Sequence, residues 1–289
     1  MRIGDQRESS NVEDMRRAGG GGFRIGGGGG LGIGGVVIAL IAAYFFGVDP
    51  SVVTSMLEGQ PTVQAPVQAE PGAAPRDEKA VFVSKVLAST EDTWAEIFRE
   101  AGQRYAPPKL VLFTQRFPTA CGMGQAAAGP FYCPADSKVY IDLSFYELMR
   151  SRFQAAGDFA EAYVIAHEVG HHVQNILGIA AKVEARRGRI SEKAHNALSV
   201  RLELQADCFA GVWAARAERT KRFLEPGDVE EAVAAATAIG DDALQAQSQG
   251  HVVPDSFTHG TSAQRVRWLR RGLETGDVNA CDTFSASRL

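Results

Sequence analysis

Residues 162–174 read AYVIAHEVGHHVQ and contain the pattern HEVGH between His167 and His171. Apolar residues recur at helical spacing here, and no proline occurs from 161 to 177, so we predict a helix. Residues four apart share one face of a helix, so the imidazoles of His167 and His171 should lie side by side. This spacing is typical of two ligands of one zinc ion, with Glu168 as the general base that takes a proton from metal-bound water.

A second stretch, VRLELQADCFAGVW at residues 200–213, places two carboxylates on an otherwise apolar helix. Glu203 and Asp207 are also four residues apart. Burying a bare carboxylate is costly, whereas a metal ion and a metal-bound imidazole would offset that cost. We therefore predict Glu203 as the third ligand and Asp207 as the acceptor of the second N–H group of a ligating histidine. The alternatives are solvated carboxylates on an amphipathic helix and ordinary surface histidines.

HEVGHHVQ followed by ELQAD resembles the glutamate-zincin metallopeptidases, in which a HExxH helix is completed by ExxxD on a later helix. The chain is similar, more narrowly, to the bacterial neutral zinc metallopeptidases, a family of membrane-anchored proteins. The similar segments run almost end to end: RESSNVED at 7–14, the glycine-rich stretch, the segment at 121–134, HGTSAQR at 259–265 and CDTF at 281–284. The resemblance implies an α+β zincin-like (gluzincin) domain, mostly helical with a small sheet.

The rest of the chain predicts one globular domain, 79–289, behind a membrane anchor. Residues 1–30 form a polar and glycine-rich tail, which we predict to be non-globular, and 49–78 read as a linker rich in Pro, Gln and Ala. Residues 31–48 carry no charge and are long enough for a transmembrane helix, although a cleaved signal peptide is the alternative. Five arginines precede this segment and none follows until Arg76. This asymmetry predicts a cytoplasmic N-terminus, an inner-membrane anchor and a periplasmic domain.

The secondary structure of the domain is predicted from periodicity. We expect helices at 80–87 and 90–101, with Ser89 capping the second, then strands at 110–113 and 138–143. The strand at 138–143 is interpreted as an edge strand that binds a peptide by strand addition. Further helices are expected at 144–153, 192–217, 229–239 and 262–273, with a turn continuing to 244. In the last of these, Trp268 and Leu269 should be buried and the arginines exposed.

Four cysteines are present, and an exported domain would permit disulfides. Cys121 and Cys133 flank a short loop, and linking them would contribute roughly 3 kcal/mol. Cys208 would then pair with Cys281, although the sequence alone allows all three connectivities. The alternative for Cys208 is a small buried apolar residue. Ligand spacing is absent among the cysteines, which disfavours zinc binding by thiolates.

A zinc peptidase benefits from a second donor that stabilises the oxyanion. His259 is the first candidate, because it lies in a loop-rich segment, and Tyr163, one turn before His167, is the second. His172 points away from the predicted metal face and is interpreted as structural. His195 is interpreted as a solvated helix residue.

Together these residues predict a zinc-dependent endopeptidase that acts on a peptide or protein substrate outside the cytoplasm. Three protein ligands leave one position for water, which is typical of catalytic zinc. The net charge of −4 and the pI near 5.9 argue against a nucleic-acid partner. The alternative is a non-catalytic envelope interaction or assembly module with a structural or vestigial zinc site. Glu168 favours the enzyme, because a structural site does not need a general base.

Overall fold

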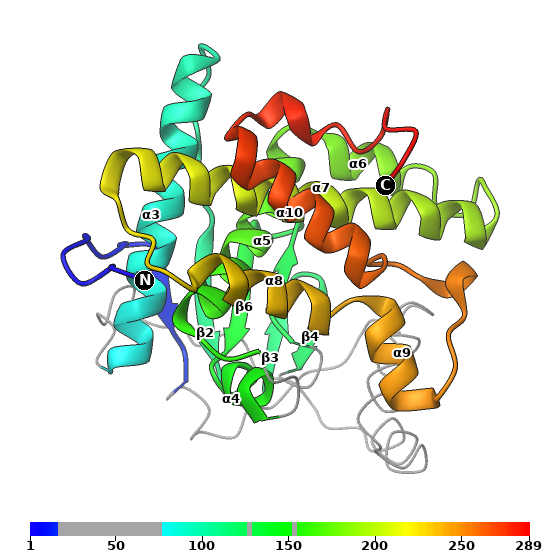
Figure 1. The fold of residues 1–289 in the computed structure, drawn as a ribbon, viewed down its shortest axis with the longest axis horizontal. Helices are drawn as coiled ribbons and strands as arrows, with labels where there is room; N and C mark the ends of the chain where they lie inside the picture. Colours follow the sequence, from blue (N-terminus) through cyan, green and yellow to red (C-terminus); the bar gives the residue numbers. More distant parts are fainter. Residues whose placement is uncertain (17–76, 126–128, 152–154) are drawn as a thin grey trace.

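A computed structural model of the chain describes residues 1–16, 77–125, 129–151 and 155–289 (Figure 1). These residues are mostly helical and contain two small sheets. The helices are α3 (Glu78–Glu100), α4 (Ser144–Ser151), α5 (Asp158–Ile176), α6 (Ile179–Glu184), α7 (Glu192–Lys221), α8 (Asp228–Ala238), α9 (Asp241–Gln249) and α10 (Ser262–Thr275), with 3-10 turns η3 (Pro254–Ser256) and η4 (Val278–Cys281). The prediction of a mostly helical domain is confirmed.

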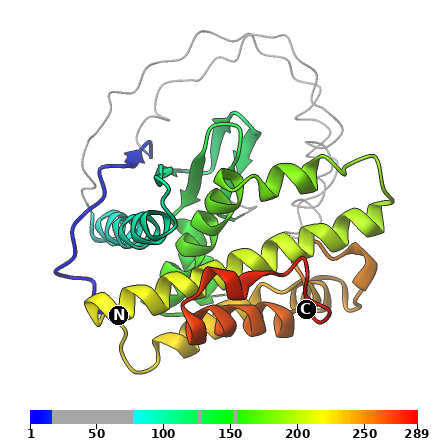
Figure 2. The same cartoon turned by 90° about the horizontal axis from the view of Figure 1, so that it is seen from above.

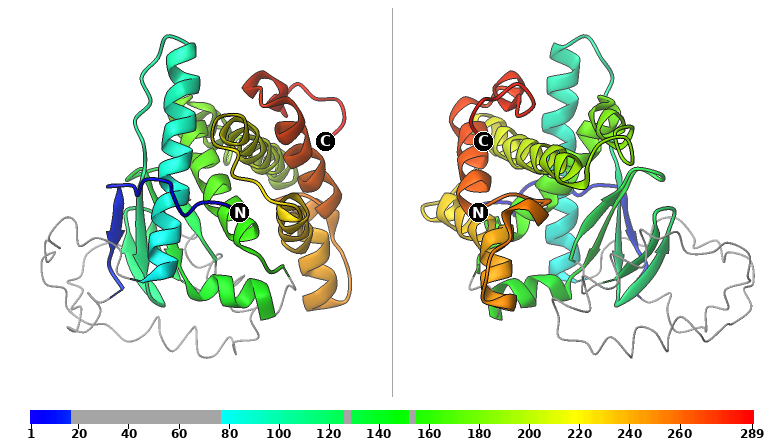
Figure 3. Two further views of the ribbon diagram at one scale, coloured as in Figure 1. Left: turned by 60° about the vertical axis from the view of Figure 1, so that its left-hand side comes forward. Right: turned by 90° about the vertical axis from the view of Figure 1, so that its right-hand side faces the viewer.

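The larger sheet has the strand order β1-β2-β6-β5, and the helices gather on one side of it (Figure 3). Its strands are β1 (Val12–Asp14), β2 (Lys109–Phe113), β6 (Lys138–Asp142) and β5 (Phe131–Cys133); a separate hairpin contains β3 (Arg116–Thr119) and β4 (Gly122–Gln125). Strands β1, β2 and β6 are parallel, and β5 is antiparallel to β6. Strand β6 therefore has a partner on each side, so the predicted edge strand is wrong, and β5 forms that edge.

Strand β2 is buried on both faces, as its continuous apolar sequence requires. Leu110 and Leu112 belong to the main core with the helices. Val111 and Phe113 belong to a smaller cluster, against which Phe117 of the hairpin packs. The hairpin thus covers the face of the sheet that the helices leave open.

Helix α3 is continuous, where two helices were predicted. Its N-terminus is capped by Asp77, whose carboxylate accepts a hydrogen bond from the Ala80 amide at 2.9 Å. Ser89, the predicted cap, lies buried in the middle of the helix, and its hydroxyl accepts a hydrogen bond from the Trp213 indole at 3.1 Å. A polar residue that looked like a boundary in the sequence is therefore a partner for a buried tryptophan.

Glycines allow three helices to approach closely around the site. A Cβ atom at Gly170 of α5 would lie 3.0 Å from the Ala206 carbonyl oxygen of α7. On the other side of α7, a Cβ at Gly211 would lie 2.2 Å from the Leu269 oxygen, and one at Gly272 would lie 2.0 Å from the Cys208 oxygen. Helices α7 and α10 consequently lie side by side (Figure 2). This packing brings the HEVGH helix, the Glu203 helix and the last helix together.

Both predicted disulfides are confirmed. Cys121 is bonded to Cys133, which joins the hairpin to β5. Cys208 is bonded to Cys281, which joins α7 to η4 and the C-terminal tail. The second bond closes a loop of 73 residues in sequence, so it ties the end of the chain to the helix that carries Glu203.

The first sixteen residues belong to the fold, which corrects the prediction of a non-globular tail. Strand β1 pairs with β2, and Met1, Ile3 and Val12 are buried in the main core. Arg7 forms ion pairs with Glu91 and Asp92 of α3 at 2.9 and 2.6 Å. The mixed charge of the first sixteen residues is therefore not the sign of a free tail, because charged residues such as Arg7 have partners on the domain.

This pairing also corrects the predicted topology. Because β1 and β2 share a sheet, the N-terminus and the domain lie on the same side of any membrane, and a cytoplasmic N-terminus with a periplasmic domain is wrong. Within the part of the chain that the structure describes, no helix is both long and apolar enough to cross a bilayer. The transmembrane helix predicted at 31–48, and the single-pass location based on it, have no support among the described residues. That segment, the glycine tract and the linker to residue 76 lie outside the described residues.

Candidate metal centre

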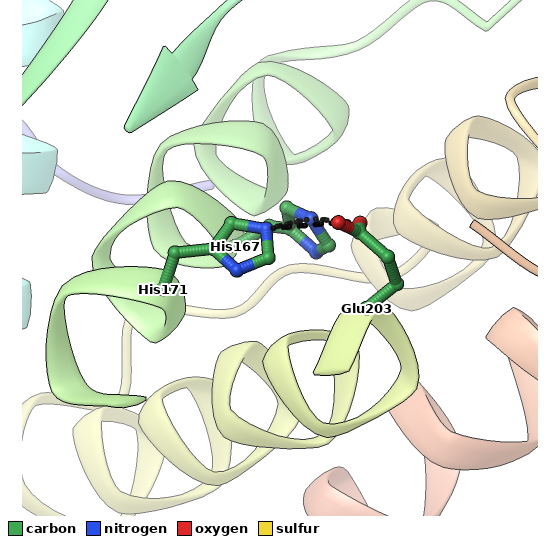
Figure 4. A group of neighbouring side chains, drawn as sticks. All are labelled: His167, His171 and Glu203. Carbon is green, nitrogen blue, oxygen red and sulfur yellow. Dashed lines mark hydrogen bonds and ion pairs between the residues drawn. The ribbon is translucent and has the colours of Figure 1, made fainter. Parts of the chain in front are cut away.

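Three side chains from α5 and α7 converge as the sequence predicts (Figure 4). The Nε2 atoms of His167 and His171 lie 3.1 Å apart. Glu203 places one carboxylate oxygen 3.2 Å from Nε2 of His167 and the other 3.5 Å from Nε2 of His171. Two ligands about 2.0–2.1 Å from a tetrahedral zinc ion are about 3.3 Å apart. The three separations are therefore close to those between zinc ligands, with one Glu203 oxygen facing each imidazole.

The first candidate ligand, His167, is oriented by a buried carboxylate. Asp207 is fully buried, and its Oδ1 atom lies 2.8 Å from Nδ1 of His167. A carboxylate only accepts, so Nδ1 carries a hydrogen, and Nε2, which faces Glu203, is the atom that a metal ion could bind. Asp207 thus has the relation to a ligating histidine that its spacing from Glu203 predicts.

Asp207 has two further partners behind the site. The Tyr163 hydroxyl donates a hydrogen bond to it at 2.5 Å. Arg265 of α10, itself almost fully buried, donates from Nε at 3.0 Å and from Nη2 at 2.9 Å, one bond to each carboxylate oxygen. Such a bidentate ion pair fixes both the position and the orientation of the carboxylate.

The electrostatics follow from these contacts. Burial raises the pKa of Asp207, but Arg265 and His167 together outweigh that effect and hold the pKa below its ordinary value. Burial lowers the pKa of His167, but the Asp207 carboxylate outweighs it and raises the pKa to about 10. Glu203 behaves like Asp207: its pKa is held well below the ordinary value against burial, chiefly by His171. In the metal-free protein His167 is consequently protonated at neutral pH, and a metal ion must displace that proton.

Glu168 lies beside the ligands and differs from the other carboxylates. It is 7% exposed, and burial raises its pKa against the opposing effect of the two histidines. Among the described residues, no hydrogen bond engages its carboxylate. A buried carboxylate with a raised pKa and free acceptor atoms suits a group that takes up and releases a proton.

His259 reaches the site from the loop before α10. Asp241 holds this loop, because its Oδ2 atom accepts the backbone N–H groups of residues 258, 259 and 260 at 2.8, 2.7 and 3.0 Å. Its Oδ1 atom lies 3.2 Å from Nδ1 of His259. Burial lowers the pKa of His259, but the nearby Glu203 and then Asp241 outweigh it and raise the pKa. The imidazole is half-exposed.

A second group of acidic residues has its own cation. Asp158, Asp228 and Glu231 gather at the N-termini of α5 and α8. The Met1 ammonium lies 2.7 Å from Asp158 and 3.3 Å from Asp228. Without a histidine, this group lacks the mixed ligands that zinc prefers.

Residues 1–284 match the family model described as "Putative neutral zinc metallopeptidase". The chain belongs to this family. It is 52% identical over 296 residues to "Uncharacterized protein YpfJ" of Escherichia coli K12, covering 99% of this chain and 100% of that protein. It is 42% identical over 220 residues to "Uncharacterized protein Rv2575" of Mycobacterium tuberculosis H37Rv, covering 72% of this chain and 73% of that protein. No solved structure matches the chain.

Two other histidines of this metallopeptidase family member are structural. His172 is buried, with Nε2 2.7 Å from the Ala106 carbonyl oxygen and Nδ1 3.0 Å from the Tyr132 hydroxyl, as a structural residue should be. Burial lowers its pKa, so it remains neutral. His195 is also buried, and its predicted exposure is wrong.

Sequence reasoning missed several residues of the site. Arg265 was predicted to be exposed with the other arginines of its helix, but it is buried against Asp207. Oε1 of Gln174 lies 2.9 Å from Nδ1 of His171. Gln174 follows His171 by three residues on the same helix, and this spacing is a signal that could have identified it. Asp241 has no such local signal, because its partners come from a loop seventeen and more residues later.

Proposed function

We propose that the protein is a zinc-dependent endopeptidase whose metal ligands are His167, His171 and Glu203. The observation that carries this proposal is the set of 3.1, 3.2 and 3.5 Å separations between their ligand atoms. Two neutral imidazoles and one carboxylate make up the donor set of many catalytic zinc sites, and they leave a fourth position for water. The family description supports the same conclusion.

Zinc held there would act as a Lewis acid toward a peptide carbonyl and lower the pKa of a bound water. In our proposal, Glu168 accepts the proton of the attacking water and then donates it to the leaving amine. Its raised pKa makes it a stronger base for taking up that proton. Asp207 keeps the Nδ1 hydrogen of His167 in place, so Nε2 stays available to the metal.

His259 is the proposed oxyanion donor. Asp241 accepts the Nδ1 hydrogen of His259, and the raised pKa of this histidine favours the imidazolium form, whose Nε2–H can donate toward the substrate. The Tyr163 hydroxyl is already committed to Asp207, on the far side of His167. We therefore expect His259→Gln to lower kcat roughly 10²–10³-fold with zinc retained. Tyr163→Phe should instead weaken zinc binding, and the reverse pattern would assign the oxyanion role to Tyr163.

The decisive experiment compares Glu168→Gln with the wild type in zinc content and in hydrolysis of a mixed peptide library. Glutamine keeps the shape of the side chain but cannot accept the proton, and Glu168 is not a ligand in this arrangement. Zinc content should be unchanged, while hydrolysis should fall about 10²–10⁴-fold. Glu184→Gln, at an exposed position on α6, is the matched control and should hydrolyse like the wild type. Full hydrolysis by zinc-loaded Glu168→Gln would refute the mechanism, and no hydrolysis by the zinc-loaded wild type would favour an interaction module with structural zinc.

A further inference from the structure

The second histidine ligand, His171, is held by an uncharged hydrogen-bond path rather than by a carboxylate. Its Nδ1 atom lies 2.9 Å from Oε1 of Gln174. The Gln174 amide nitrogen donates to the Leu202 carbonyl at 2.7 Å and to Oε1 of Gln205 at 3.1 Å. The Gln205 amide nitrogen donates in turn to the Cys281 carbonyl at 3.0 Å. Both glutamines are buried, at 1% and 6% exposure, so these bonds do not compete with water.

The direction of every bond in this path is set from its far end. A backbone carbonyl only accepts, so the Cys281 oxygen requires the amide nitrogen of Gln205, and Oε1 of Gln205 must face Gln174. The Leu202 oxygen and this Oε1 atom then require the amide nitrogen of Gln174, whose Oε1 atom must face His171. The hydrogen of His171 therefore sits on Nδ1, and its Nε2 lone pair points toward His167 and Glu203.

The far end of the path lies in the C-terminal tail, which is fastened to α7 around Glu203. Cys281 is bonded to Cys208, five residues beyond Glu203 on α7. The Thr283 hydroxyl donates to the Arg201 carbonyl at 2.7 Å, two residues before Glu203. The tail thus contacts α7 on both sides of the third ligand, and through Gln205 it also reaches the second ligand.

We propose that the C-terminal tail is part of the metal centre: Gln174 and Gln205 are positioning residues for His171, and the Cys208–Cys281 disulfide sets the zinc affinity through them. This inference rests on the proposed zinc site. The two metal-binding histidines then differ in kind, since His167 is fixed by the charged Asp207 and His171 by a neutral path that ends in a thiol-sensitive cross-link. Reduction of this disulfide should release the Cys281 carbonyl, free both amides and weaken zinc binding.

The test measures zinc affinity of the full-length protein by competition with a chelator. Methionine preserves the length of a glutamine side chain but neither donates nor accepts in its place. Gln174→Met should lower zinc affinity about 10–100-fold, which is typical of residues that hold a metal ligand. Gln205→Met should act in the same direction. Gln247→Met, at an exposed position on α9, is the matched control and should bind zinc like the wild type.

A double-mutant comparison then separates the path from general destabilisation. Replacing both Cys208 and Cys281 with alanine should lower zinc affinity in the wild type but have little further effect in Gln174→Met, because the path is already cut. The visible spectrum of the cobalt-substituted protein should change both in Gln174→Met and in the protein with Cys208 and Cys281 replaced. Zinc affinities of Gln174→Met and Gln205→Met equal to the wild type, or full additivity with the cysteine replacement, would overturn the inference. Should Gln174→Met not fold, Gln205→Met with the same cysteine replacement decides the matter. A wild type that binds no zinc would instead refute the proposed function.

Discussion

Replacing Arg265 with methionine should strongly destabilise the protein, because its guanidinium forms a buried ion pair with Asp207. Methionine keeps an apolar stem of similar length and removes the guanidinium. The side chain it replaces is 3% exposed and donates two hydrogen bonds to Asp207, which is fully buried. The variant therefore keeps a buried carboxylate and loses one of its two cationic partners, while His167 stays 2.8 Å away.

The magnitude follows from this burial. Removing one partner of a buried ion pair costs about 3–5 kcal/mol, whereas exposed pairs contribute about 0–1 kcal/mol. A domain is typically stable by about 5–15 kcal/mol, so the loss is a large share of the total. We expect the free energy of unfolding of Arg265→Met to fall by about 3–5 kcal/mol at neutral pH.

The loss should also depend on pH in a defined direction. In the wild type, the lowered pKa of Asp207 means that its carboxylate stabilises the fold above about pH 3.9 and that this stabilisation is lost as pH falls through the folded-state pKa. In Arg265→Met, burial remains and His167 alone opposes it, so the pKa of Asp207 should be higher than in the wild type. Protonation then relieves the buried charge, and the difference from the wild type should shrink on acidification.

Urea unfolding at pH 7 and pH 5, with disulfides intact and a chelator present, measures this difference. Arg270→Met is the matched control, because Arg270 is exposed on the same helix, and it should change stability by no more than about 0.5 kcal/mol. A loss below about 1 kcal/mol for Arg265→Met, or a loss that grows toward low pH, would refute the reasoning.

Three further outcomes are expected. Gly272→Ala should cost about 1–3 kcal/mol or more in urea unfolding, because its Cβ would lie 2.0 Å from the Cys208 oxygen; unchanged stability would exclude the close approach of α7 and α10. In the metal-free protein, NMR titration should place the pKa of His259 above its ordinary value of about 6.5, and Asp241→Asn should lower it, whereas an unaltered titration would contradict their contact. Zinc at about 100 times its Kd should stabilise the fold by roughly 2.7 kcal/mol, and a melting temperature that does not change when zinc is added would contradict binding to the folded state.

The core of the site could be predicted from sequence because its geometry is local. Spacing by four residues on a helix determines which side chains share a face, and this holds for His167 with His171 and for Glu203 with Asp207. The long helix was predicted at 192–217 and is found at Glu192–Lys221. Two carboxylates on an otherwise apolar helix need partners, and this requirement predicted that the helix of Glu203 packs against the helix of His167.

What the sequence could not reveal depends on contacts between distant residues. The partner of Arg265 is Asp207, 58 residues away, so an arginine on an amphipathic helix gave no sign of burial. The path from His171 to Cys281 uses glutamine side chains, which carry no charge whose burial would demand an explanation. Its members Gln205 and Cys281 are 76 residues apart.

The sheet was harder to predict than the helices. Strands β1 and β5 contain three residues each, too few for a recognisable alternation. Strand β6 was therefore interpreted as an edge, and the polar N-terminal segment was interpreted as a tail. The pairing of Val12 with Leu110 joins residues 98 positions apart, which local periodicity does not report.

X-ray absorption at the zinc edge of the full-length protein tests the central claim most directly. The proposed centre predicts one four-coordinate zinc ion with nitrogen and oxygen ligands at about 2.0–2.1 Å and the scattering pattern of two imidazoles. Sulfur ligands at about 2.3 Å are not expected, because all four cysteines form disulfides. Zinc ligated by sulfur, zinc without imidazole, or an absence of bound zinc would contradict the assignment of His167, His171 and Glu203.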